Sequence, residues 1–400
     1  MAVTYYSEYK NKKLCEVVLL GSHDAGIAKG NSNTQTQTKG IGDQALKGAR
    51  FFDLRIAAFA NSGHGAGTVS MRAYHDDTKQ SSYHKSNTRQ NLGTLDADGQ
   101  IANNRNQAMK VDYTVGGAKG GELYNMLAEA KAFVSAGPGA KEFLMLKFDK
   151  STNWPLIADA CIDVLGTSIY APPGDKANLN ECTLRELRGK VIVLFTKDGC
   201  GACGLTALQR RQRGILEWKN LYSSKSGSAG GYQRNFVGLQ YYGKGGVSAS
   251  ASGQTGKIRM NAEVQTALMQ GQGAYKTEKT KKTATTAAQA STRGVHAGVD
   301  ANVVGLMYWT TTGMSTGGIQ KRNDKMWNKP NQEMLVACTG LATEMLPSNV
   351  NVADGGAANE VKRFMPNIIM VDFVTEHQGN LVKALNTKSA TEISAVINQA

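Results

Sequence analysis

Short apolar runs recur along the chain, and each is bounded by glycine, asparagine, aspartate or lysine. Most are nearly continuous in apolar character rather than strictly alternating, which is typical of strands covered on both faces in a parallel sheet. The pattern predicts eight such strands, the number that a closed barrel requires. They lie at residues 15–23, 50–56, 68–75, 142–149, 190–195, 235–242, 303–310 and 367–374.

Stretches typical of helices separate several of the predicted strands. The repeated order of strand and helix favours a single α/β barrel of the TIM type, (β/α)8, which would occupy residues 1–400. The four clearest helical stretches lie at residues 121–134, 154–165, 205–221 and 331–346.

The chain is longer than a barrel of this kind needs. An ordinary (β/α)8 barrel takes about 250 residues, so the excess is expected in loop insertions. One predicted insertion, at about 76–120, is rich in Asn, Gln, Asp and Gly, and the other, at about 223–298, is interrupted by Ser- and Gly-rich sequence. Neither has the apolar density of a separate domain.

The chain of 400 residues is 41% hydrophobic, which is enough to bury a sizeable core. No apolar run approaches the ~20 residues of a membrane-spanning helix. The N-terminus, MAVTYYSEYKNKK, lacks the apolar segment of a signal peptide. Secretion or export without a visible signal peptide is therefore expected, and a cytoplasmic location stays an alternative.

The net charge of +14 indicates an anionic partner, which could be a lipid surface, a nucleic acid or a phosphorylated substrate. Zinc-finger spacing and basic strands rich in aromatic residues are both missing, so nucleic acid is not expected. The basic residues are scattered, and we interpret the densest run as a solvated loop or helix face. That run consists of Lys276, Lys279, Lys281 and Lys282.

Six cysteines are too few in a chain of this length for a disulfide scaffold. Cys200 and Cys203 follow a predicted strand in the order strand, turn, Cys-x-x-Cys, helix, which is similar to thioredoxin and glutaredoxin. Those folds need a proline some tens of residues after the motif, and the next proline here is Pro330. A structural role is favoured, and a dithiol redox protein is the less favoured alternative. Zinc is not expected, because no second cysteine pair has the right spacing.

Polar side chains stand where three of the predicted strands end. The segment GSHDAG places His23 and Asp24 after the first strand, at the carboxyl end where barrel active sites form. Asp53 and Arg55 lie two apart in RFFDLRI and so share one face. His75 ends the third predicted strand. Buried charges need partners, so this set indicates an anion site or a structural ion pair.

Five of these segments, in this order, resemble the X-domain of phosphatidylinositol-specific phospholipase C. They are GSHDAG, RFFDLRI, the strand that ends at His75, EFLMLKFDK and IIMVDF, and together they span most of the predicted barrel. The resemblance implies a phosphodiesterase, a hydrolase or lyase that cleaves the head group from phosphatidylinositol or a similar phospholipid. It also implies a peripheral membrane protein, and we expect a monomer. A non-catalytic barrel that binds lipid or glycan is the main alternative.

The resemblance implies a role for each polar residue. His23 would take a proton from the inositol hydroxyl, and His75 would give one to the leaving group, by way of a cyclic phosphodiester. Asp372 ends the last predicted strand, which neighbours the first strand once the barrel closes, so it would orient His23. Asp24 would support His75, and Arg55 would bind the phosphate.

The same resemblance implies which residues contact the substrate and whether a metal ion is needed. Lys147 and Asp149 are similar to a polar pair that contacts the head group, and Tyr242 and Trp309 would stack on the sugar ring. Calcium-dependent members carry an acidic ligand where Arg55 stands, and metal-independent bacterial members have arginine there. No cofactor is therefore expected; if a cation were bound, Asp53 and Asp149 would be its ligands.

One feature departs from the family. Its members usually have His followed by Gly after the third strand, whereas His75 is followed by Asp76. His64 is followed by glycine in SGHGAG, but no strand precedes it. We favour His75 as the acid, because a catalytic group is best held on a rigid element.

Overall fold

The computed structural model describes eleven stretches of the chain and one residue near its end. They are residues 2–30, 32–60, 69–75, 118–151, 153–173, 177–221, 231–246, 254–269, 302–311, 318–345, 366–387 and 397. His64, the lysine run at 276–282 and most of both predicted insertions lie outside them.

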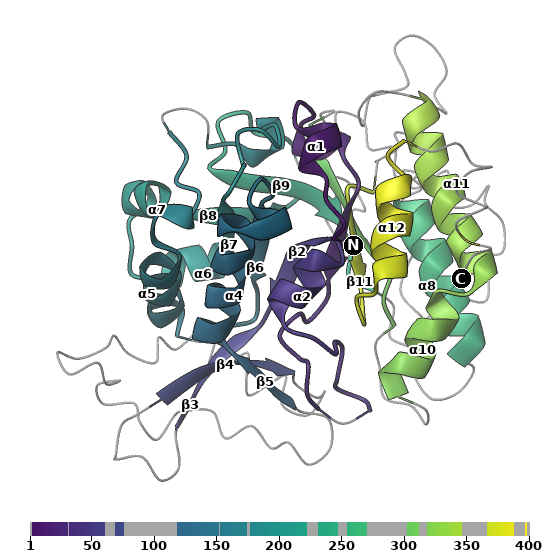
Figure 1. The fold of residues 1–400 in the computed structure, drawn as a ribbon, viewed down its shortest axis with the longest axis horizontal. Helices are drawn as coiled ribbons and strands as arrows, with labels where there is room; N and C mark the ends of the chain where they lie inside the picture. The colour runs from purple at the N-terminus through teal and green to yellow at the C-terminus, as the bar shows by residue number, and fades with distance from the viewer. Residues whose placement is uncertain are drawn as a thin grey trace.

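The centre of the molecule is a closed barrel of parallel strands (Figure 1). The order around the barrel is β1-β11-β10-β9-β8-β7-β6-β2, so the first and last strands are neighbours. The (β/α)8 barrel predicted from the sequence is confirmed. Its strands are β1 (Leu19–Ser22), β2 (Ala49–Leu54), β6 (Leu144–Phe148), β7 (Val191–Thr196), β8 (Ile215–Asn220), β9 (Gly238–Gly243), β10 (Val304–Tyr308) and β11 (Ile368–Val371).

Both faces of these strands are buried, which explains their continuous apolar character. Alternate residues point into the barrel and pack against one another, as Phe51, Met145 and Leu194 do. The residues between them, such as Phe52 and Leu146, pack outward against the helices. The strand sequences therefore supply two separate apolar layers.

Helices surround the barrel, with α4 to α7 on one side and α8 and α10 to α12 on the other (Figure 1). They are α1 (Tyr6–Tyr9), α2 (Ile41–Leu46), α4 (Leu123–Ser135), α5 (Trp154–Leu165), α6 (Lys197–Ala202), α7 (Ala207–Arg213), α8 (Gln254–Met269), α10 (Gly318–Met326), α11 (Lys329–Met345) and α12 (Glu376–Ala384). Short 3-10 helices occur at η1 (Leu14–Glu16), η3 (Gly137–Gly139), η4 (Gly166–Ser168) and η5 (Leu179–Glu181). Among the described helices, none is both long and apolar enough to cross a bilayer.

The third predicted strand, 68–75, is not part of the barrel. It forms β4 (Val69–His75), the middle strand of a separate antiparallel sheet with β3 (Ile56–Ala60) and β5 (Ala118–Glu122). Only Arg55 separates β2 from β3, so this sheet extends from the carboxyl end of a barrel strand, below the barrel in Figure 1. The apolar pattern indicated a strand but not the sheet to which it belongs.

The predicted helix 205–221 is wrong in its second half. Helix α7 begins after Thr206, whose hydroxyl accepts a hydrogen bond from the Gln209 amide, and it ends at Gly214. Gly214 has a φ of +77°, and a Cβ there would lie 2.8 Å from the Tyr170 carbonyl oxygen. The chain then turns into β8, which supplies the barrel strand that 68–75 does not.

The predicted insertion at 223–298 overlaps the predicted strand at 235–242. That strand is present as β9, which pairs with β8 and β10 inside the barrel. The predicted insertion also includes α8, whose residues Ile258, Ala262 and Leu268 pack in the outer core. These described parts of the stretch therefore belong to the barrel itself.

Candidate functional site

Charged side chains form a layer at the carboxyl end of the barrel, next to the apolar interior. The carboxyl ends of parallel strands meet at one rim, which brings residues from distant parts of the chain together. Four buried residues of this layer continue the inward-facing series of their strands. They are His23 after β1, Asp53 in β2, Lys147 in β6 and Asp372 after β11.

His23 is held in one orientation by its neighbours. Its Nδ1 lies 2.9 Å from the Asp372 Oδ1, and both side chains are buried. The amide of His23 donates to the Val371 carbonyl oxygen, which extends the pairing of β1 with β11 to the rim. The Tyr308 ring meets the imidazole edge-on, with the centroids 5.8 Å apart. Because Nδ1 faces a carboxylate, it carries the proton, and Nε2 is left for chemistry.

Asp24 lies at the centre of the site. Its Oδ2 is 3.6 Å from the Nε2 of His23 and 3.6 Å from the Nε2 of His75, while its Oδ1 is 3.1 Å from the Arg55 Nε. One carboxylate thus meets two imidazoles and a guanidinium. Burial opposes its ionisation, but the charges of Arg55, His23 and His75 outweigh burial and hold its pKa well below the usual range.

His75 reaches the rim from the antiparallel sheet rather than from a barrel strand. The amide of Tyr74 donates to the Arg55 carbonyl oxygen at 3.0 Å, and the Tyr74 hydroxyl donates to the Lys150 carbonyl oxygen. The end of β4 is therefore fixed to two parts of the rim, and the His75 side chain is 20% exposed. His75 thus has the rigid support expected from the sequence, on a different element.

Lys147 joins two carboxylates across the rim. Its Nζ lies 3.0 Å from the Asp53 Oδ1 and 3.0 Å from the Asp149 Oδ2. Burial disfavours the ammonium ion, yet Asp149 and Asp53 together raise the pKa of Lys147 well above its usual value. Burial likewise opposes ionisation of Asp149, but Lys147 lowers its pKa to about 2. Of the three, Asp149 is the least buried, with 33% of its side chain exposed, so it is best placed to meet a ligand.

Tyr242 and Trp309 do not reach the site. Both are fully buried in the outer core, between the barrel and the helices. The preceding residues in the inward series, Tyr241 and Tyr308, pack against the barrel interior instead. The Tyr241 ring stacks on Trp218 with centroids 3.9 Å apart. The sequence contained this signal, because side chains alternate between the two faces of a strand.

Left-handed backbone conformations gather at the same rim. Among the described residues other than glycine, positive φ occurs at Asp24, Lys150, Asn153 and Phe373. Each of them follows β1, β6 or β11 within a few residues. Such conformations are costly for residues with a Cβ and cluster at functional sites, which supports this rim as the site.

His23, Asp24 and Asp53 could hold a metal ion, since one ligand atom from each lies within 4.8 Å of the others. Both carboxylates, however, already contact protein cations, Asp24 through Arg55 and Asp53 through Lys147. Calcium takes about six to eight oxygen ligands, and this set offers two carboxylates and a nitrogen. The donor set does not fit calcium.

Cys200 lies on α6 and Cys203 directly follows this helix, and both are buried in the outer core between the barrel and the helices. Burial raises the pKa of the Cys200 thiol to about 12, against the lowering effect of Arg210. A redox dithiol requires a readily ionised thiol, so this environment does not support redox chemistry.

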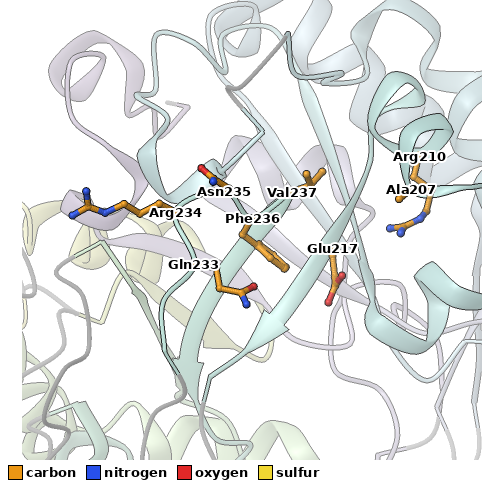
Figure 2. Close-up of a pocket in the computed structure, with 8 residues that line it drawn as sticks. All are labelled: Ala207, Arg210, Glu217, Gln233, Arg234, Asn235, Phe236 and Val237. Carbon is orange, nitrogen blue, oxygen red and sulfur yellow. The ribbon is translucent and has the colours of Figure 1, made fainter.

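A pocket of about 540 Å³ lies outside the barrel, between α7 and the residues that precede β9 (Figure 2). Arg210 and Glu217 line it, together with Gln233 and Phe236. It opens over the beginning of β9, so it shares no residue with the rim, where the strands end.

No family model matches the chain, and no curated protein matches its sequence. Among solved structures, it is similar to a mutant phosphatidylinositol-specific phospholipase C from Staphylococcus aureus, with 14% identity, a TM-score of 0.41 and coverage of 90% of this chain and 88% of that one. A second structure of the S. aureus enzyme comes from work on the modulation of its membrane binding. It has 13% identity and a TM-score of 0.43, and the match covers 92% of this chain and 90% of that one. A calcium-dependent phosphoinositol-specific phospholipase C from a Pseudomonas species has 11% identity and a TM-score of 0.34 over 64% and 82%.

Proposed function

We propose that the protein is a phosphodiesterase that cleaves the head group of phosphatidylinositol or a similar phospholipid. The observation that carries the proposal is the contact of one buried carboxylate, Asp24, with two imidazoles and a guanidinium within 3.1 to 3.6 Å. Two groups that can transfer protons and one that can bind a phosphate oxygen are what a phosphodiester cleavage needs.

The reaction begins with attack by a hydroxyl that neighbours the phosphate. The Nε2 of His23 accepts the proton of that hydroxyl while its oxygen bonds to phosphorus. His75 donates a proton to the departing alkoxide as the phosphorus–oxygen bond to the lipid breaks, which leaves a diacylglycerol and a cyclic phosphodiester. Arg55 holds the phosphate oxygens as negative charge develops on them. Water can open the cyclic ester later, with the two histidines in reversed roles.

The charged groups also support metal independence and action at a membrane surface. Arg55 supplies the positive charge that a cation would otherwise bring to the phosphate. A net charge of +14 would draw the protein to a membrane that contains anionic lipids.

Phosphorus NMR of the reaction with phosphatidylinositol vesicles tests both the bond that breaks and the role of metal. We expect an inositol cyclic phosphate as the first product, formed at the same rate with and without a chelator. Phosphatidic acid as the first product would contradict the proposed bond cleavage. Loss of turnover in the chelator, restored by calcium, would contradict metal independence.

The pH profile tests the assignment of His23 as the base. Burial opposes protonation of His23, but Asp24 and Asp372 raise its pKa to about 9. Since only the neutral imidazole accepts a proton, kcat/KM should rise about tenfold per pH unit below this pKa for as long as His75, the acid, stays protonated. The variant Asp372→Asn removes one of the carboxylate charges that raise this pKa, so we expect its profile to rise at a lower pH and its activity to fall. A profile that keeps its position in this variant would show that another group is the base.

A further inference from the structure

Lys150 lies at the rim, directly after Asp149, and the mechanism above does not use it. Its φ is +46°, in the left-handed region that a residue with a Cβ rarely adopts. The conformation is fixed from both sides, because the amide of Lys150 donates to the Asp149 Oδ1 at 2.7 Å and its carbonyl oxygen accepts from the Tyr74 hydroxyl. Lys150 is an exposed residue. The two hydrogen bonds therefore hold its backbone rigidly at the rim.

The backbone of Lys150 lies beside that of Arg55, because Tyr74 donates one hydrogen bond to the Lys150 carbonyl oxygen and another to the Arg55 carbonyl oxygen. The guanidinium of Arg55 is the strongest influence on the Lys150 ammonium group and lowers its pKa, with burial acting in the same direction. Asp149, Asp24 and Asp53 act in the opposite direction. Lys150 in turn helps to hold the pKa values of Asp24 and Asp149 low. Lys150 thus lies next to Arg55 along the rim, and its charge acts on both Arg55 and the central carboxylate.

Two neighbouring cations that repel each other form an arrangement that an anion between them would stabilise. Among the residues that the structure describes, none forms an ion pair with Lys150, whereas Lys147 is paired with both Asp53 and Asp149. Arg55 contacts Asp24 through Nε, which leaves its two terminal nitrogens for a ligand. Within the described residues, Lys150 therefore supplies a second positive charge beside Arg55 that is not taken up by an ion pair.

We propose that Lys150 is a second phosphate-binding residue, which contacts the reacting phosphate together with Arg55 and stabilises its developing charge. This inference rests on the proposed function and adds one residue to its site. Lys150 transfers no proton in this scheme. Its ammonium remains charged and donates hydrogen bonds to a phosphate oxygen that does not leave.

The test compares Lys150→Met with Lys12→Met, which removes the same charge from an exposed lysine that precedes β1, at the opposite end of the barrel. We expect Lys150→Met to lower kcat/KM on phosphatidylinositol vesicles about 10- to 100-fold, the effect of one lost hydrogen bond to a charged group. Lys150→Arg should restore most of that loss, because it returns a cation that can bind phosphate. Lys12→Met should match the wild type. Equal activity of Lys150→Met and Lys12→Met would overturn the proposal.

A binding measurement separates this proposal from the function on which it rests. Inorganic phosphate serves as the probe, and its affinity is measured by calorimetry for the wild type, Lys150→Met and Lys12→Met. We expect a loss of affinity in Lys150→Met alone. Such a loss in a protein that does not cleave phosphatidylinositol would support the anion site and overturn the proposed function. Unchanged phosphate affinity in all three proteins would overturn the role of Lys150, whether or not the lipid is cleaved. Thermal unfolding of each variant identifies any change that comes from the fold.

Discussion

The variant His23→Ala is expected to lower kcat/KM on phosphatidylinositol by about 10⁴-fold, the upper end of what one proton-transfer group contributes. The base would be lost, and its partner Asp372 would be left without the ring that it contacts at 2.9 Å. Because Asp24 and Arg55 remain in contact, phosphate should still bind. Initial rates with vesicles, together with vesicle co-sedimentation, would separate turnover from binding.

A second variant and a control make the His23 result specific. His23→Asn keeps a side-chain donor that can face Asp372, so its fold should be less disturbed while the base is still absent. His377 lies on α12 and is half-buried, and within the described part of the chain no ion pair joins it to the rim, so His377→Ala should keep wild-type activity. Turnover within tenfold of wild type in His23→Asn would remove His23 from the mechanism. Loss of vesicle binding along with turnover would instead favour the binding role that the sequence left as an alternative.

The barrel could be predicted from the sequence because its strands carry an unusually clear signal. In β7 every residue from Val191 to Phe195 is buried and apolar. In β6 every residue from Leu144 to Phe148 is buried, and Lys147 is the one charged residue among them. Closure of the barrel then made the first and last strands neighbours. That step correctly placed Asp372 beside His23, although the two lie 349 residues apart.

Two elements were predicted wrongly because their local sequence is compatible with more than one structure. Residues 69–75 form a real strand, but an apolar run does not specify whether it pairs in parallel or antiparallel fashion. Residues 215–220 follow seven helical residues without a proline, and only the left-handed Gly214 marks the boundary. A glycine at this position is a common helix end, so a stricter use of that signal would have separated α7 from β8.

The sequence predicted that the charged residues lie together at the rim, but it placed the wrong aromatic residues there. Buried charges are rare in strands, so His23, Asp53 and Arg55 were conspicuous in the sequence. Tyrosine and tryptophan, in contrast, serve equally well on either face, and the choice of Tyr242 depended on the phase of the strand. Leu239 faces the barrel interior, and counting by two from it reaches Tyr241. The meeting of both imidazoles on Asp24 is a tertiary feature that no spacing in the sequence records.

The opposite end of the barrel holds a buried ion pair on which stability should depend. Arg50 is 0% exposed and Glu142 is 1% exposed, and the Arg50 Nε lies 3.0 Å from the Glu142 Oε2. The other carboxylate oxygen of Glu142 accepts hydrogen bonds from the backbone amides of Tyr5 and Tyr6. The Arg50 guanidinium also donates to three carbonyl oxygens, those of Val3, Ala45 and Ala49. The pair therefore joins the N-terminal segment, the end of α2, and strands β2 and β6.

The variant Glu142→Ala should lower the free energy of unfolding by about 3–5 kcal/mol, the usual cost of leaving a buried charge without its partner. The double variant Arg50→Met with Glu142→Leu should regain part of that loss, because neither charge is then buried alone. Glu263→Ala breaks the exposed pair with Arg259 on α8 and should cost less than about 1 kcal/mol. Urea denaturation of the four proteins gives these differences. Because the pair lies at the end of the barrel away from His23, kcat measured well below the unfolding transition should stay at the wild-type value in Glu142→Ala. A loss of stability no greater than that of Glu263→Ala would show that the pair does not join these segments.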